Sequence, residues 1–434
     1  MRDQKLLQRV AYGAASACYG AMFNWSYAHV ESVNFDYGGA VFNPPTSLGL
    51  LACYIMAILP AMWMSPEADR PSSVALTVFY VLVYVPFVFV APHVLPWPLQ
   101  DVLLLEGFLL VCLALISGLV ALPCRAFALI RVRESSYVLG LAVVTITLAL
   151  LTAALNGFKV DLSIADVYTR RLAARETVEA GSASGYAVAL LASTLLPLAL
   201  IIGIARRRIV LVGASLLAVI AIFSLAGQKS IALTPLMLLG AYALIRWARR
   251  WFGAMVCLGM AALIAISDVA AIVYDNIVPA AVFSFRLLSG AGINMSRYFE
   301  FFSAHPYYLL RGSVLRTVLS SPYDRPMTMM MGAQYDPTEA LNLNSNVWAT
   351  AFGDGGYWAI ILSSLIMGLL LWILDSLARG RHAIVFRVFG AFLGLIFAAM
   401  ALPTAFITGG VVPSLAALYV LAGTLPDQVH SAHA

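Results

Sequence analysis

Charged side chains are scarce in this sequence. Asp, Glu, Lys and Arg make up 11% of the 434 residues, whereas hydrophobic residues make up 62%. A soluble protein usually carries charge on roughly a quarter of its residues. A chain of this size cannot hide so much apolar surface from water, which excludes an ordinary soluble domain and predicts a protein of the lipid bilayer.

Cysteine and histidine are also few, and their spacing indicates no metal or redox chemistry. The five cysteines lie in or beside apolar runs, so they form neither a disulfide framework nor a zinc spacing. The six histidines show no metal-ligand spacing. Phosphate-loop, dinucleotide and HExxH motifs are missing as well. We therefore expect no metal and no cofactor.

What the sequence does contain is a series of twelve apolar runs, each about long enough to cross a bilayer. Continuous apolar runs are typical of membrane helices, whereas the strands of a membrane barrel alternate. We predict an all-α polytopic integral membrane protein of about 12 transmembrane helices, forming a single transmembrane domain over residues 1–434. The predicted spans are 10–29, 47–64, 74–91, 102–122, 137–156, 185–205, 209–225, 231–246, 252–273, 356–374, 383–402 and 411–425.

The basic residues give these spans an orientation. Five clusters of Lys and Arg fall on one side of the membrane when twelve spans are counted, which is the positive-inside pattern. They are Arg2–Arg9, Arg125–Arg133, Arg206–Arg208, Arg246–Arg250 and Arg379–Arg387. This distribution explains the net charge of +5 without nucleic acid. It predicts cytoplasmic termini and two large periplasmic loops, at about 157–185 and 274–356.

The two loops hold most of the ionisable groups of the predicted outer side. In the first, Ser163 and Asp166 resemble a helix cap, which predicts a helix with Arg171 and Arg175 on one face and Arg170 able to pair with Asp166. In the second, the aromatic-rich segment 296–310 suits a helix in the headgroup region.

Arginine on the outer face is disfavoured by the positive-inside tendency, so these arginines indicate a function. A guanidinium group binds phosphate in fork geometry, and a periplasmic enzyme has no ATP. A phosphorylated membrane lipid is therefore the expected substrate. The sequence leaves open the alternative that the arginines only form ion pairs with nearby carboxylates.

Several motifs of the loops resemble those of the Wzy-type O-antigen polymerases. Arg170 and Gly181 reproduce the family's spacing of an arginine, ten residues and a glycine in the main periplasmic loop. Lys229 ends a Gly-Gln-Lys segment that is similar to the family's basic hairpin. Arg286 and the segments 298–302, 342–346 and 353–357 resemble the second loop and the entry to the next span. The spacing departs at Arg297, which stands where the second loop would have glycine.

The resemblance implies a membrane glycosyltransferase of the GT-C type in the bacterial inner membrane. It implies that oligosaccharide repeat units carried on undecaprenyl diphosphate are joined at the periplasmic face, and nothing in the sequence demands a metal. A chain-length regulator protein is a further expected partner, and nucleic acid is not. The implied catalytic residues are Arg170, Arg175 and Arg286, and the implied substrate-binding residues are Arg171, Lys229, Arg297, Tyr298, Asn344 and Asn346.

The sequence leaves three other functions open. An O-antigen ligase would use the same donor with lipid A-core as acceptor, and His305 in the second loop keeps that reading open. A flippase or transporter would need charges within the spans, where Glu106 and Asp268 are the main candidates and both lie near predicted span ends. A structural membrane scaffold is the third.

Overall fold

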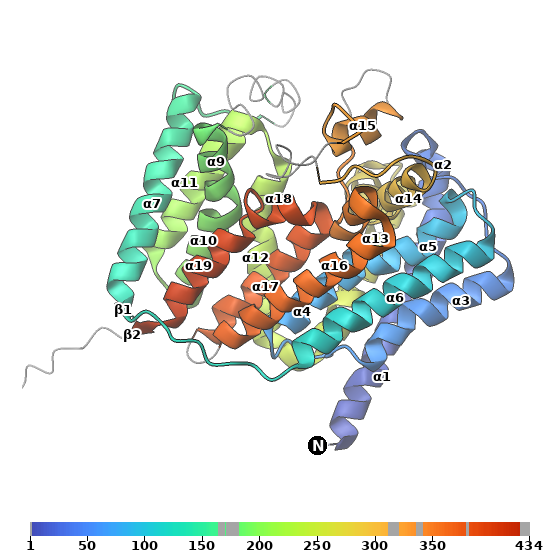
Figure 1. The fold of residues 1–434 in the computed structure, drawn as a ribbon, viewed down its shortest axis with the longest axis horizontal. Coiled ribbons are helices and arrows are strands. Elements are labelled where there is room, and N and C mark those ends of the chain that lie inside the picture. Colours follow the sequence, from blue (N-terminus) through green and yellow to red (C-terminus); the bar gives the residue numbers. More distant parts are fainter. Residues whose placement is uncertain are drawn as a thin grey trace, which may run out of the picture. The chain divides into compact units, whose positions relative to one another are not determined.

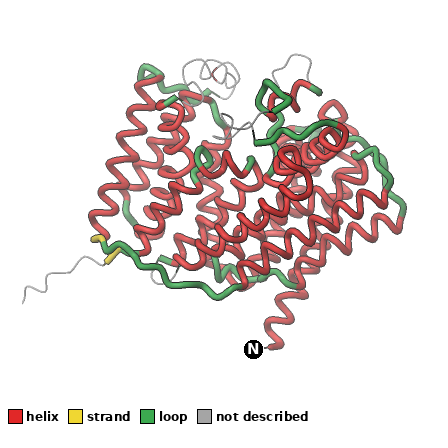
Figure 2. The backbone as a smooth tube through the Cα atoms, in the orientation of Figure 1, coloured by secondary structure: helices red, strands yellow, loops and turns green. Residues whose placement is uncertain are grey.

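The computed structural model describes residues 2–163, 170, 182–310, 321–335, 342–378 and 382–425, most of which are helical (Figures 1 and 2). Nine of the described helices are long and apolar enough to cross a membrane, and two shorter apolar helices span Ser47–Met62 and Ala383–Ala399. The predicted all-α, polytopic membrane architecture is confirmed at this level. The nine are Pro71–Val94, Leu99–Ala121, Glu134–Leu155, Ala183–Arg206, Ile209–Ala226, Ser230–Trp247, Arg249–Val273, Val347–Leu377 and Leu402–Ala422.

Each of the twelve predicted spans overlaps a described helix. Three predicted spans are not among the nine long apolar helices. The first span overlaps a helix with four charged residues near its beginning, and the second and eleventh spans overlap the two shorter helices. Twelve crossings and a GT-C fold stay predictions.

The chain groups into two compact units, and a single transmembrane domain over residues 1–434 stays a prediction. Unit 1 comprises 1–123, 248–372 and 393–404, and unit 2 comprises 124–247, 373–392 and 405–434. The elements of unit 1 are α1 (Arg2–Ser26), η1 (Tyr27–Glu31), α2 (Ser32–Asn34), η2 (Asp36–Gly38), α3 (Ser47–Ile58), η3 (Leu59–Met62), α4 (Pro71–Phe79), η4 (Tyr80–Tyr84), α5 (Val85–Val94), α6 (Leu99–Ala121), η6 (Arg249–Trp251), α13 (Phe252–Val273), η7 (Ala280–Ser289), α14 (Gly290–Ala304), α15 (Met327–Ala333) and most of α16 (Val347–Leu377).

Unit 2 contains β1 (Val132–Arg133), α7 (Glu134–Leu155), α9 (Ala183–Leu190), η5 (Leu191–Leu195), α10 (Leu196–Arg206), α11 (Ile209–Ala226), α12 (Lys229–Trp247), α19 (Val411–Ala422) and β2 (Thr424–Leu425). Two further helices, α17 (Ala383–Ala399) and α18 (Leu402–Phe406), contribute residues to both units. The two strands pair in parallel over two residues each, with Val132 opposite Thr424.

In unit 1, α1 packs along α13, and α14 packs along α5. Glycine makes the second contact close, because a Cβ added at Gly292 would lie 2.9 Å from the carbonyl oxygen of Pro86. A small residue at such a crossing lets two membrane helices approach at backbone distance. The aromatic side chains of Tyr298, Phe299 and Phe302 on α14 are consequently buried within the unit. This differs from the predicted helix in the headgroup region, because the aromatic face of α14 packs against protein.

Residues predicted to lie on the same side of the membrane contact one another in unit 2. Arg206, at the end of α10, forms an ion pair with Glu134 at the start of α7, with Nε and Oε1 3.8 Å apart. Its Nη2 also lies 2.8 Å from Nδ1 of His382, and Nε2 of His382 lies 2.9 Å from the Thr424 hydroxyl. Glu134, Arg206 and His382 lie in predicted cytoplasmic loops, and Thr424 lies at the predicted cytoplasmic end of the last span, so these contacts are those expected from the predicted alternation of spans.

Unit 1 shows the same agreement. The amide of Ala68 donates to the Arg249 carbonyl at 2.9 Å, and the Arg70 guanidinium donates to the Val120 carbonyl at 3.0 Å. Ala68, Arg70 and Arg249 lie in loops predicted to face the cytoplasm, and Val120 lies near the predicted cytoplasmic end of its span. These contacts are those expected when an even number of spans separates the two segments of each pair.

The helix α16 is interrupted where the second loop was predicted to end. Gly355 and Gly356 leave the helical conformation, and Gly356 has a φ of 67°. A Cβ at Gly356 would lie 2.6 Å from the Tyr307 hydroxyl oxygen, so both the backbone conformation and the space favour glycine there. The residues before the break, from Val347 to Asp354, form a helix of their own beside the second loop.

Candidate functional site

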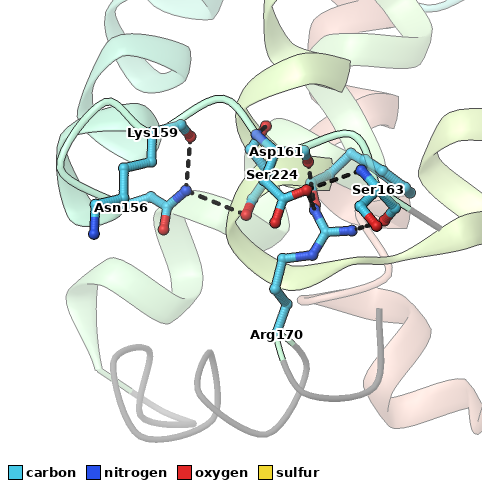
Figure 3. Close-up of polar contacts among 7 residues, drawn as sticks. Asn156, Lys159, Asp161, Ser163, Arg170 and Ser224 are labelled. Atoms are coloured by element: carbon cyan, nitrogen blue, oxygen red, sulfur yellow. Dashed lines mark hydrogen bonds and ion pairs between the residues drawn. The ribbon is translucent and has the colours of Figure 1, made fainter. Parts of the chain in front are cut away.

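Arg170 is held by backbone carbonyl groups of unit 2 (Figure 3). Its Nη1 donates to the carbonyl oxygen of Asp161 and, at 3.4 Å, to that of Phe223, while its Nη2 donates to the carbonyl oxygen of Ser163. Nη1 also lies 3.5 Å from the Asp161 carboxylate, and the guanidinium sits 5.1 Å from the centre of the Phe223 ring. The arginine side chain is only 12% exposed, so its guanidinium interacts mostly with protein groups and little with solvent.

The segment that Arg170 holds is also fastened to the end of α11. The amide of Asp161 donates to the Ser224 hydroxyl at 3.1 Å, and the Asn156 side chain donates to the Ser224 carbonyl at 3.2 Å. Asn156 donates to the Lys159 carbonyl as well, at 2.8 Å. Arg170 therefore positions the start of the first loop on α11. Its expected partner Asp166 lies outside the described residues, as do Arg171 and Arg175.

The predicted basic hairpin lies at the same end of α11. This helix ends at Ala226 and α12 begins at Lys229, so only two residues connect them. Gly227 closes α11 in the left-handed conformation, with φ of 57°, and its amide donates to the Phe223 carbonyl at 2.9 Å. Because Arg170 also contacts Phe223, the hairpin backbone and Arg170 share one end of α11. The side chain of Lys229 is outside the described residues.

Arg286 lines a cavity of about 260 Å³ in unit 1. The helical face that carries it continues through Gly290 to Asn294, at intervals of four residues, and the segment 344–346 forms the opposite wall. Ligand pockets usually hold roughly 300–1,000 Å³, so this cavity suits a phosphate-sized group better than a whole lipid-linked sugar. Its lining includes three residues singled out from the sequence, Arg286, Asn344 and Asn346.

The polar groups of this cavity differ in how they are engaged. Arg286 is exposed and forms no ion pair or hydrogen bond within the described part of the chain. Ser345 is buried, and its hydroxyl has no hydrogen-bond partner there. The Asn294 side chain donates to the Asn344 carbonyl at 3.0 Å, which joins the two walls. Within the described ranges, the lining of this cavity thus holds an exposed guanidinium without a partner and a buried serine whose hydroxyl lacks one, and such groups are donors for an anion.

The remaining residues of the Asn-rich segment support the cavity wall. Asn346 caps α16, since its Oδ1 accepts from the amides of Trp348 and Ala349 at 3.0 Å each. The Tyr298 hydroxyl donates to the Leu343 carbonyl at 2.9 Å. Both Asn346 and Tyr298 are almost fully buried. The structure thus places Tyr298 behind the segment, in a position to hold it and not to touch a ligand.

Arg297 lies in a separate set of contacts. Its Nη2 donates to the Gly38 carbonyl at 3.1 Å, and its guanidinium stacks 4.0 Å from the centre of the Tyr335 ring. Burial lowers the pKa of the Arg297 guanidinium and raises the pKa of the Tyr335 hydroxyl. The Arg297 side chain therefore ties α14 to η2 and to the end of α15.

His305, the histidine of the second loop, contacts the aromatic residue one helical turn before it. Nδ1 of His305 lies 2.9 Å from the Phe301 carbonyl, and its ring stacks on the Phe301 ring with centres 4.1 Å apart.

The second cavity, of about 290 Å³, is lined by Trp97, Asp101, Leu104, Leu105, Phe108 and Tyr357. Its lining contains no cation, so it offers a phosphate no ion pair. No three His, Cys, Asp or Glu side chains gather as metal ligands within the described ranges.

Sequence reasoning missed Ser345 and Asn294. Ser345 lies between two asparagines that were singled out, but nothing in the sequence indicates which residue of this segment faces a cavity. Asn294 could have been found, because Arg286, Gly290 and Asn294 recur every four residues and so share one helix face.

Comparison of the chain with protein-family models, curated proteins and solved structures found no match.

Proposed function

We propose that this chain is a membrane glycosyltransferase of the GT-C type, a Wzy-type polymerase that joins lipid-linked repeat units into O-antigen or a related surface polysaccharide. The observation that carries the proposal is the cavity whose lining includes the Arg286 guanidinium and Ser345, neither of which has a side-chain hydrogen-bond or ion-pair partner among the described residues. The loop motifs that resemble the Wzy family support it, and the twelve apolar runs with five basic clusters supply the membrane frame.

The proposed reaction fits the groups of this cavity. The bond between the anomeric carbon of the growing glycan and its diphosphate oxygen breaks, and a bond to a hydroxyl of the next repeat unit forms. Undecaprenyl diphosphate leaves, and the acceptor hydroxyl releases one proton. Negative charge grows on the leaving diphosphate, and Arg286 stabilises that charge through paired N–H donors. Ser345 and Asn294 add neutral donors beside it.

The arginines then have different tasks. Arg286 contacts the diphosphate in this proposal and is the catalytic residue of the cavity. Arg170 is a positioning residue, because its donors already hold backbone carbonyls of the first loop and α11. It would set the place from which Arg171 and Arg175 reach the substrate. Because Arg170 and Arg286 belong to different units, a single site built from both stays a prediction.

The decisive experiment compares surface polysaccharide on gels from a strain that lacks the gene and from strains that carry variants. Loss of a polymerase leaves core bearing one repeat unit, and Arg286→Lys should leave that pattern with more than about tenfold less long polysaccharide, because one ammonium cannot supply the paired donors. Ser345→Ala should reduce it less. Lys159→Gln, which removes an exposed cation of the same predicted side, is the control and should leave it unchanged.

Other band patterns would contradict the proposal. Bare core in the deletion strain, with polymerised glycan still made on its lipid, would indicate a ligase. Full-length polysaccharide from Arg286→Lys at normal protein level would remove Arg286 from the chemistry.

The proposed setting is the inner membrane with cytoplasmic termini. Reporter fusions after Val167 and Pro322 should report the periplasm, and fusions after Arg208 and Arg379 should report the cytoplasm. A cytoplasmic signal from either large loop would overturn the assignment of the cavity to the outer face.

A transporter or flippase is the second candidate, and one observation favours it. Glu106 on α6 and Asp268 on α13 are almost completely buried within unit 1, although the sequence placed them near span ends. Buried carboxyl groups inside membrane spans are typical of ion and proton pathways. Loss of a flippase would leave bare core while lipid-linked single repeat units accumulate at the cytoplasmic face, which separates this function from a polymerase.

A further inference from the structure

Two buried carboxyl groups meet in unit 1, between the end of the first helix and α13. Glu31 ends η1 and Asp268 lies on α13, and neither is more than 2% exposed. The Ser26 hydroxyl oxygen lies 3.3 Å from Oε1 of Glu31 and 2.9 Å from Oδ1 of Asp268. One serine therefore bridges two acids that are 237 residues apart in sequence, since 268 − 31 = 237.

The donors at this bridge are too few for two ionised carboxylates. A serine hydroxyl has one proton, so it donates to only one of the two acids at a time. The other oxygens of the pair, Oε2 of Glu31 and Oδ2 of Asp268, have no partner among the described residues. Ser289, also wholly buried, faces the Glu31 carboxyl but makes no well-formed hydrogen bond with it.

Among the described residues, no positive charge pairs with either acid. Besides Asp268, the titratable groups that interact electrostatically with Glu31 are Tyr19 and Tyr27. The ring of Tyr27 contacts His93, whose own Nδ1 is buried and has no hydrogen-bond partner in the described part of the chain. Arg286 is on the same helix as Ser289 but is exposed and lines the cavity described above. Two bare carboxylates in such a place would be strongly unfavourable.

We propose that Glu31, Asp268, Ser26 and Ser289 form a binding site for one monovalent cation, H⁺ or Na⁺. A single positive charge leaves one net negative charge, which the two serine hydroxyls can stabilise by hydrogen bonds. A shared proton would donate from one carboxyl group to the other oxygens, whereas Na⁺ would take the same oxygens as ligands. Both ions use the oxygen atoms that now lack partners, and the site stands independently of the proposed glycosyl transfer.

The site is placed to matter for the outer cavity. The helix η7 packs against both η1 and α13, and it presents Ser289 toward the acids while Arg286 lines the cavity. The bound cation would therefore neutralise negative charge of the two acids next to η7, the helix that carries Arg286.

The test measures thermal unfolding of the purified full-length protein in detergent micelles, in NaCl or choline chloride at equal ionic strength, from pH 5.5 to 8.5. If the ion is Na⁺, NaCl should raise Tm over choline chloride by at least about 2 °C. If it is H⁺, Tm should fall by a similar amount as pH rises, whichever salt is present, because the folded pair holds a proton that the unfolded chain releases. Asp268→Asn and Glu31→Gln should each abolish the response to NaCl if the ion is Na⁺, and should each reduce the response to pH if the ion is H⁺, because one buried acid then remains.

Asp275→Asn is the matched control, since Asp275 is exposed just beyond α13 and asparagine tolerates its positive φ. It should respond as the wild type does. If Asp268→Asn does not fold, Ser26→Ala keeps both acids and separates the two ions: it should enlarge the pH response if the ion is H⁺, because the bridging donor is lost, and reduce the NaCl response if the ion is Na⁺, because a ligand is lost. A wild-type Tm that is indifferent to Na⁺ and pH, an unchanged response in both acid variants, or stabilisation by Ca²⁺ alone would overturn the proposal.

Discussion

Arg170→Lys should loosen the start of the first loop while keeping the positive charge. In the wild-type protein, Nη1 and Nη2 together reach the carbonyls of Asp161, Ser163 and Phe223. A lysine has its donors on a single nitrogen, which cannot occupy both positions. The variant therefore loses about one charge-assisted hydrogen bond inside a mostly buried network, worth about 1.5–3 kcal/mol.

The ion pair with Asp161 adds little to this figure. Its carboxylate is 41% exposed, and solvent screening reduces a pair of this kind to less than about 1 kcal/mol. We therefore expect a loss of about 2 kcal/mol in the free energy of local opening, which corresponds to about 30-fold faster amide exchange. Asp161→Asn, which keeps an oxygen for the Ser163 amide, should speed exchange by less than about fivefold.

Hydrogen–deuterium exchange followed by mass spectrometry measures this directly. The informative peptide covers 156–163, and a peptide from α13 in the other unit serves as the internal reference. Unchanged exchange in Arg170→Lys would show that the guanidinium does not hold the segment. An equal effect of Asp161→Asn would mean that the ion pair, and not the carbonyl contacts, carries the stability.

Two further variants test the loop supports. Gly356→Ala should lower Tm, because alanine is strained at φ of 67° and its Cβ would meet Tyr307, whereas Gly213→Ala, with open space around it inside α11, should leave Tm unchanged or raise it. Arg297→Lys should also lower Tm, since lysine loses the planar stack on Tyr335, and an unchanged Tm would show that this stack contributes no stability.

The helices were largely predictable from the sequence, because an apolar run in a bilayer must pair its backbone N–H and C=O groups with one another, which a helix does. The hairpin at Gly227 was predictable for a similar reason, since two residues between long apolar runs permit only a tight turn. The contacts of Arg170 were not. They depend on three carbonyl groups, and every residue has a carbonyl, so the sequence carries no mark of which ones converge.

The site was predictable in part for the same reasons. Arg286 stood out as an outer arginine, and the asparagines of 342–346 stood out by their resemblance to a segment of the Wzy-type polymerases. Their meeting in one cavity depends on the close crossing of α14 and α5 at Gly292, which brings the cavity-lining face of α14 into position. The acid pair was missed because Ser26 and Asp268 are 242 residues apart and belong to helices whose pairing the sequence does not state.

The break in α16 has a mechanical consequence. Its short first part is fastened to the second loop, since the amide of Tyr308 donates to the Gly353 carbonyl at 2.7 Å and the amide of Leu310 donates to the Asp354 carboxylate at 2.9 Å. Asn346 joins the same part to the cavity wall. Because Gly355 and Gly356 leave the helical conformation, α16 has a kink between its short first part and its long apolar part. The short first part therefore joins residues 308–310 to the cavity wall, and a shift of those residues would reach the wall through it.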